Sequence, residues 1–239
     1  MFGASEKDRQ KEIALVSLGM SCQTAHQLRF NQPYLEDFGI GPEAIPSNYF
    51  DWLICPPDSA ARLLADGLPR FERGDIVLKS QPFWEAYQFY FWHEFRHHEI
   101  IDIDAHFEIG QQKFDYLRER FSRLHLYRRL IFVLSNIQGN LPEVHAETGA
   151  LDFMLDDQRI QALRSVVQSY LGRSVEFLVI TSKGRFEGPV GSGYEIAFFA
   201  EDTSEWKGDK VAWRTCLQQY FTKFPISGTG VSAQKDDYG

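Results

Sequence analysis

Short apolar runs alternate with segments of helical periodicity along this chain of 239 residues. Strands are expected at 13–19, 130–134, 175–181 and 195–200, and helices at 22–30, 59–66, 114–124, 157–170 and 211–221. Helices that connect successive apolar strands make right-handed crossovers, which turns the strands into parallel neighbours. We therefore predict an α/β fold: a largely parallel sheet, with some antiparallel strand content, covered by helices on both faces as a three-layer sandwich.

Polar residues at the expected helix starts support these boundaries. Ser21 is the predicted N-cap of the first helix, Asp58 or Ser59 of the second, and Asp156 or Asp157 of the helix over 157–170. Side-chain oxygens at such positions accept hydrogen bonds from the first free backbone N–H groups of a helix.

Two segments have a different character. Residues 31–50 are rich in Gly, Pro and Asn and are interpreted as a loop. Residues 76–95 are strongly aromatic, and the alternation of Phe89, Phe91, His93 and Phe95 predicts one face of a strand, with a helix as the alternative. We expect a single domain over 1–226 and a disordered tail over 227–239.

Charge and cysteine usage restrict the function classes. The 33 acidic and 25 basic residues give a formal charge of −8, which disfavours nucleic acid and anionic membranes as partners. Three widely spaced cysteines indicate neither a disulfide framework nor a zinc knuckle, so a reducing, cytoplasmic location is expected. Neither G-x-G-x-x-G nor G-x-x-x-x-G-K-[ST] occurs, and no cofactor is expected.

Cys22 is the first candidate for chemistry because it stands where a strand, a glycine turn and a helix meet. Unpaired N–H groups and the positive end of the helix dipole at such a position lower the pKa of a thiol. A thiolate there is a good nucleophile, and its own N–H can stabilise an oxyanion. The alternative is a small buried residue that fills the corner.

His93 is the expected general base, because the aromatic residues around it would hold its ring in one orientation. The string His93-Glu94-Phe95-Arg96-His97 is also a literal H-E-x-x-H, the pattern of zinc metalloproteases. That interpretation requires a helix, and a distant residue such as Glu119 as third ligand.

Several blocks of the sequence together resemble a known family. They are Ser17-Leu-Gly-x-x-Cys22, Phe50-Asp-Trp-Leu53 and His93-Glu-Phe95, followed by a helix and Leu130-Ile-Phe-Val133. This pattern is similar to that of the papain-like cysteine peptidase family of uncharacterised proteins, over roughly residues 13–135. Members of the family tend to have Asp where this chain has Glu94.

The resemblance implies a catalytic set. Cys22 would be the nucleophile, His93 the base, and Asp51 the carboxylate that orients the imidazole. Asp51 alternatively caps a helix or pairs with an arginine such as Arg29.

The predicted function is that of a cysteine-dependent hydrolase or acyltransferase acting on a peptide or small acyl substrate, with Ser21, Trp52 and Trp92 at the substrate. Two alternatives remain open from the sequence. One is a non-catalytic binding or scaffold domain in which the aromatic segment forms a recognition wall. The other is a zinc hydrolase that uses His93, Glu94 and His97.

Overall fold

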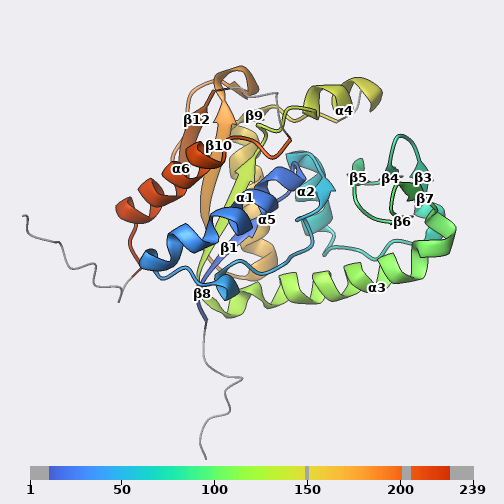
Figure 1. Cartoon of the computed structure of the whole chain (residues 1–239), viewed down its shortest axis with the longest axis horizontal. Coiled ribbons are helices and arrows are strands. Elements are labelled where there is room, and N and C mark those ends of the chain that lie inside the picture. Colours follow the sequence, from blue (N-terminus) through green and yellow to red (C-terminus); the bar gives the residue numbers. More distant parts are fainter. Residues whose placement is uncertain (1–10, 149–150, 201–205, 227–239) are drawn as a thin grey trace, which may run out of the picture.

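A four-stranded parallel sheet forms the centre of the computed structural model, which describes residues 11–148, 151–200 and 206–226. Its strands lie in the order β1 (Lys11–Ser17), β8 (Tyr127–Ser135), β10 (Glu176–Ser182) and β12 (Glu195–Phe199) (Figure 1). Neighbouring strands pair in register, with Val16 beside Phe132 and Phe177 beside Phe132 from the other side. The predicted α/β class and the largely parallel sheet are confirmed.

Helices cover both faces of this sheet. One face packs against α1 (Cys22–Asn31) and α6 (Lys210–Lys223), and the other against α2 (Pro57–Ala65), α3 (Ile103–Ser122) and α5 (Asp157–Leu171). Figure 1 shows α1 and α6 in front of the strands. Side chains alternate along each strand, so that Leu15 and Val133 face α1 and α6, while Phe132 faces the opposite layer. The three-layer arrangement follows from this alternation.

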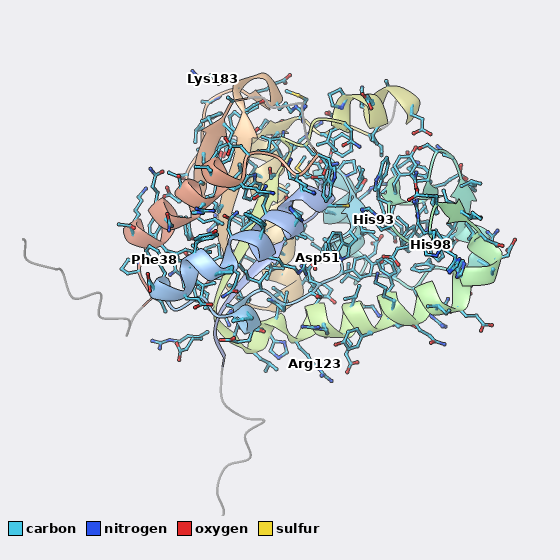
Figure 2. The ribbon with its side chains drawn as sticks, viewed as in Figure 1. Phe38, Asp51, His93, His98, Arg123 and Lys183 are labelled. Carbon is cyan, nitrogen blue, oxygen red and sulfur yellow. The ribbon has the colours of Figure 1, made fainter. Side chains whose placement is uncertain are left out.

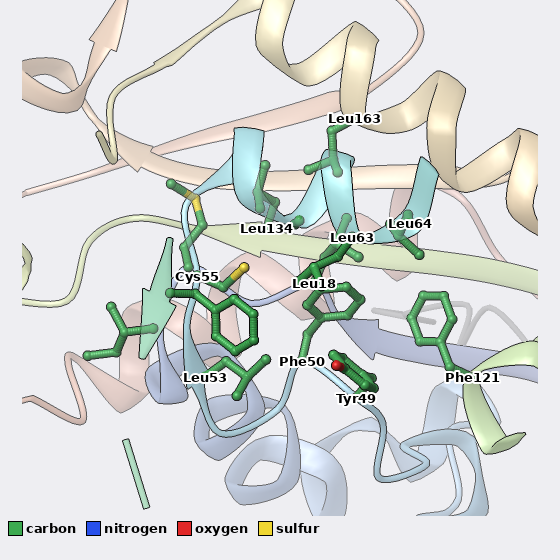
Figure 3. Close-up of a cluster of buried hydrophobic side chains, with 14 of the residues drawn as sticks. Leu18, Tyr49, Phe50, Leu53, Cys55, Leu63, Leu64, Phe121, Leu134 and Leu163 are labelled. Carbon is green, nitrogen blue, oxygen red and sulfur yellow. The ribbon is translucent and has the colours of Figure 1, made fainter. Parts of the chain in front are cut away.

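The core on the second face is continuous from the sheet to the helices. Figure 3 shows Leu18 and Leu134 from the sheet side packed with Leu63 of α2 and Leu163 of α5. Phe121 of α3 closes the same cluster (Figure 3). These side chains are buried, so the long connection between β1 and β8 is held against the sheet by apolar contact.

A second, antiparallel unit, here called the aromatic lobe, is formed by residues 53–54 and 71–101. Its strands are β2 (Leu53–Ile54), β5 (Phe89–Phe91), β4 (Pro82–Trp84) and β3 (Ile76–Leu78), in that order, with a separate hairpin of β6 (Arg96–His97) and β7 (Ile100–Ile101). Phe71 lies at its centre, with ring centroids 5.1 Å from Phe91 and 5.7 Å from Phe114. The aromatic side chains of β4 and β5 are buried and fill a core, so the segment is not an exposed recognition wall.

The predicted strand face over 89–95 is wrong beyond Phe91. Strand β5 ends there, and the chain turns before β6 begins at Arg96. Phe89, Tyr90 and Phe91 are all buried, because both faces of this short strand are covered. His93 lies in the turn and leaves part of its surface exposed to solvent.

Other differences concern helix ends. Helix α2 begins at Pro57, with Pro56 at the N-cap, rather than at an Asp58 or Ser59 cap, because proline suits the first turn. The predicted loop 31–50 contains two 3₁₀ helices, η2 (Gln32–Phe38) and η3 (Pro42–Ala44). Asp156 caps α5 by accepting from the N–H of Arg159, as one of the two predicted choices.

Shorter elements complete the described chain. They are η4 (Arg73–Asp75), η5 (Arg123–Leu126), α4 (Leu141–Thr148), β9 (Leu155–Asp156), η6 (Lys183–Arg185) and β11 (Phe186–Glu187). The predicted tail 227–239 lies outside the described residues. Among those that are described, no helix has both the length and the apolar character needed to span a bilayer.

Candidate active site

The turn between β1 and α1 sets the position of Cys22. Gly19 and Met20 both have positive φ angles, 83° and 63°. The N–H of Leu18 donates to the carbonyl of Val133 on β8, and the N–H of Met20 donates to the carbonyl of Cys55, each at 3.0 Å. A positive φ is uncommon for a residue other than glycine, and such strain clusters at functional sites. The turn delivers Cys22 to the first position of α1, at the carboxyl edge of the sheet.

The thiol of Cys22 is buried, with a relative exposure of 2% for the residue. Burial raises the pKa of Cys22 to about 12, and its own backbone N–H acts in the opposite direction. The carboxylates of Asp51 and Glu94 lie near enough to raise this pKa further. The expected lowering of the thiol pKa is therefore wrong in this conformation, because lost hydration outweighs the favourable N–H group.

Polar groups surround the start of α1. Ser21 occupies the N-cap position as predicted, but its hydroxyl makes no capping bond. Instead, the side-chain oxygen of Gln138 accepts from the N–H of Gln23 at 3.2 Å. Among the residues that the structure describes, the buried hydroxyls of Ser17 and Ser135, which end β1 and β8, have no hydrogen-bond partner, and neither has that of Ser21. Ser17 and Ser135 thus lie at the carboxyl ends of two parallel strands, the edge of an α/β sheet outside which ligands bind.

Asp51 is buried and both of its carboxylate oxygens are occupied. One oxygen accepts from Arg29 on α1 and, at 3.0 Å, from the N–H of Asn48, while the other accepts from the side-chain amide of Asn48. Burial raises the pKa of Asp51, and the Arg29 guanidinium and the Asn48 N–H oppose that rise. The alternative pairing with Arg29 is thus confirmed. Asp51 makes no hydrogen bond to His93 within the described chain.

His93 lies against Trp52, with ring centroids 5.8 Å apart in an edge-to-face arrangement. Figure 2 labels His93 and Asp51. Partial burial lowers the pKa of His93, the charges of Arg96 and Lys113 lower it further, and Glu94 opposes them. Its imidazole is therefore neutral at pH 7 and able to accept a proton. In the described part of the chain, no hydrogen bond joins it to the Cys22 sulfur.

The two predicted substrate-binding tryptophans are both partly exposed. The guanidinium carbon of Arg29 lies 5.4 Å from the centroid of Trp52, so this ring is held between Arg29 and His93. Trp92 meets Tyr90 edge-on at 6.0 Å and packs on the aromatic lobe. Arg29, Trp52 and His93 thus form one contact series that begins at Asp51.

The helix required for a zinc site is absent from residues 93–97, which form a turn and β6. Glu94 is buried and forms an ion pair with Lys113 at 2.5 Å. Across the described residues, no group of three or more His, Cys, Asp or Glu side chains is placed to hold a metal ion. The H-E-x-x-H string is therefore not arranged as a zinc motif.

Sequence reasoning missed the loop that follows β8. Asn136 and Gln138 are buried, although 136 and 138 come directly after a strand rather than within one. Arg185, after β10, donates to the carbonyls of both residues. Polar side chains immediately after a buried parallel strand are the signal that indicates such a loop.

Comparisons with known proteins found no match: no family model, no curated protein and no solved structure matches the chain.

Proposed function

We propose that the protein is a cysteine-dependent hydrolase or acyltransferase, with Cys22 as its nucleophile and His93 as the base. The supporting observation is the position of Cys22 as the first residue of α1, directly after the strained turn at Met20. Its own N–H favours the anionic sulfur, and the same group suits an oxyanion formed by attack on a carbonyl. The resemblance to the papain-like cysteine peptidases assigns the same residues.

The burial of Cys22 defines how such a reaction must start. A thiol with a pKa of about 12 is protonated at pH 7 and needs a base to attack, as a serine hydroxyl does. His93 is neutral at this pH, since its pKa is lowered. Glu94, its neighbour in the chain, is near enough for its charge to act on the thiol. The reaction therefore requires a movement that uncovers Cys22 and brings the His93 imidazole within reach of its sulfur.

The chemistry has two balanced steps. The sulfur attacks the carbonyl carbon while His93 takes the thiol proton, and the proton then passes to the departing alcohol or amine as its bond to carbon breaks. Water, or another acceptor, next attacks the thioester and releases the acyl group, with the free thiol restored. Asp51 acts here as a positioning residue, because its bond to Arg29 holds Trp52 against His93.

This chemistry requires a reduced thiol, which persists in a reducing compartment. We therefore also propose a cytoplasmic location, and a peptide or small acyl compound as the substrate.

The test is to trap the acyl-enzyme. Incubation with p-nitrophenyl acetate is expected to release nitrophenolate in a burst and to place one acetyl group on Cys22, detected by peptide mass spectrometry. Cys22→Ser should abolish the adduct, and His93→Ala should slow its formation by about a hundredfold or more. Cys216→Ser, which removes another buried thiol, is the matched control and should leave the adduct unchanged. An absence of acetyl-Cys22 in the unmodified chain would refute the proposal.

A further inference from the structure

A cavity of about 420 Å³ lies beside the carboxyl ends of β8 and β10. Its walls come from the start of α4, from the segment before β9 and from Gly184 and Arg185 after β10. Figure 2 labels Lys183, the residue that follows β10 and directly precedes Gly184 and Arg185. The volume is within the range of small-molecule sites, and ligands of α/β proteins bind outside the carboxyl ends of the strands.

Apolar side chains form most of the cavity wall: Leu141, Pro142, Phe153 and Met154. Phe153 and Leu141 are buried, and Met154 is partly exposed. Asn136, whose side-chain amide donates to the carbonyls of Phe153 and Arg185 at 2.8 and 2.9 Å, ties two walls together. The cavity is therefore formed before any ligand arrives.

The polar groups at this cavity already have partners within the protein. Asp152 pairs with Arg159 at 2.6 Å, and it also accepts from the N–H of Met154 at 2.9 Å. The ring nitrogen Nδ1 of His145 contacts the carbonyl of Leu151. Since these groups are satisfied by the protein, the free wall favours hydrocarbon over a charged ligand.

One loop separates the cavity from Cys22. On one side, Gln138 accepts from the N–H of Gln23, the residue that follows Cys22 in α1. On the other side, the carbonyl of Gln138 accepts from Arg185 at 2.7 Å, and Arg185 lines the cavity. Arg185 and Gln138 therefore connect the cavity wall to the first turn of α1.

We infer that this cavity binds the hydrocarbon part of the acyl group that Cys22 accepts. The inference rests on the proposed function and names its preferred substrate class: esters, thioesters or amides of medium-length apolar acids, which should bind more tightly than those of acetate or of charged acids. The carbonyl would point past Gln138 toward Cys22, and the chain would lie among Leu141, Phe153 and Met154.

The test measures binding apart from catalysis. The full chain carrying Cys22→Ser is titrated with hexanamide and with acetamide, and backbone amide shifts are followed by NMR. Each methylene buried is expected to tighten binding roughly threefold, so hexanamide, with four more methylenes, should bind about eightyfold more tightly than acetamide. The shifts should concentrate at 141–145, 152–154 and 184–185.

Met154→Glu, which introduces a carboxylate into the apolar wall, should remove hexanamide binding, and Met154→Leu should retain it. A thermal melt of each variant checks that it is folded. Equal affinity for the two amides, or hexanamide binding that survives Met154→Glu in a folded chain, would overturn the inference.

The two proposals fail separately. Hexanamide binding without any acyl-Cys22 would leave the cavity assignment intact and reject the nucleophile. Acetylation of Cys22 without tighter binding of the longer amide would support the nucleophile and reject the cavity assignment.

Discussion

Arg29 donates from α1 to the buried carboxylate of Asp51 in the segment that precedes β2. The side chain of Asp51 is 2% exposed, while that of Arg29, which also donates to Ser47, is 32% exposed. This pair fixes the helix that carries Cys22 against the segment that carries Trp52. It is therefore the link between the two parts of the proposed active site.

Removal of Arg29 should destabilise the fold, because it leaves a buried carboxylate without its cation. Arg29→Met is expected to lower the free energy of unfolding by about 2 to 3 kcal/mol, less than for a fully buried pair because Arg29 is partly solvated. Urea denaturation of the variant and of the unmodified chain measures this difference in the free energy of unfolding. The matched control is Arg128→Met at the exposed pair with Glu12, expected to change stability by less than about 0.5 kcal/mol. Equal effects of both variants would contradict this role for Arg29.

Cys22 should react slowly with iodoacetamide in the absence of substrate. With a pKa of about 12, only about one thiol in ten thousand is ionised at pH 8, against roughly a quarter of ordinary thiols. The alkylation rate, followed by mass spectrometry of the Cys22 peptide, should rise about tenfold per pH unit between pH 8 and 10. The chain unfolded in guanidinium is the reference. A folded rate at pH 8 that equals the unfolded one would show that the thiol is not held protonated.

The pKa of His93 should depend on the charged side chains beside it. Its pKa is lowered from the ordinary value, so the neutral imidazole persists to more acid pH than in the unfolded chain. By linkage, the unfolded state binds the proton first as the pH falls, so protonation of this site disfavours the fold below about pH 6.5. Proton NMR of the ring gives the value directly.

Two variants with opposite signs check the origin of this shift. Glu94→Gln removes the charge that raises the pKa of His93 and should lower it further, whereas Arg96→Gln should raise it. If both variants move the pKa in the same direction, a change in burial rather than in charge is responsible.

Gly110 should not tolerate alanine, even though it lies inside α3. A Cβ there would lie 2.5 Å from the Phe95 ring, and Phe95 itself is held at a φ of 58°. Gly110→Ala is expected to lower the free energy of unfolding by about 1 to 3 kcal/mol through overpacking, rather than to raise it by about 1 kcal/mol as in an exposed helix.

A double-mutant cycle with Phe95→Ala isolates the contact. In that background the overpacking is gone, and Gly110→Ala should be neutral or stabilising. If Gly110→Ala still lowers the free energy of unfolding in the Phe95→Ala background, the contact with Phe95 is not the cause of the destabilisation.

Periodicity and turn residues were sufficient for the parallel sheet. The alternation of Leu15 and Val16 between opposite faces, and the helices that precede β8 and β10, are local features that the sequence records directly. The position of Cys22 at the start of α1 could be predicted in the same way, from Gly19 and the helical pattern that follows. The N-cap Asp156 and the helix α5 that it starts could also be predicted, because capping depends on residues adjacent in the sequence.

The chemical state of the candidate site was decided by the tertiary structure. The pKa of Cys22 depends on how much water the rest of the chain excludes, and the partner of Asp51 depends on where α1 lies. Gln138, which meets Gln23 from 115 residues away, has no counterpart in any local pattern. Hydration and charge act through space, while a sequence pattern reports only neighbours along the chain, so the sequence determined the scaffold and the fold determined what its residues face.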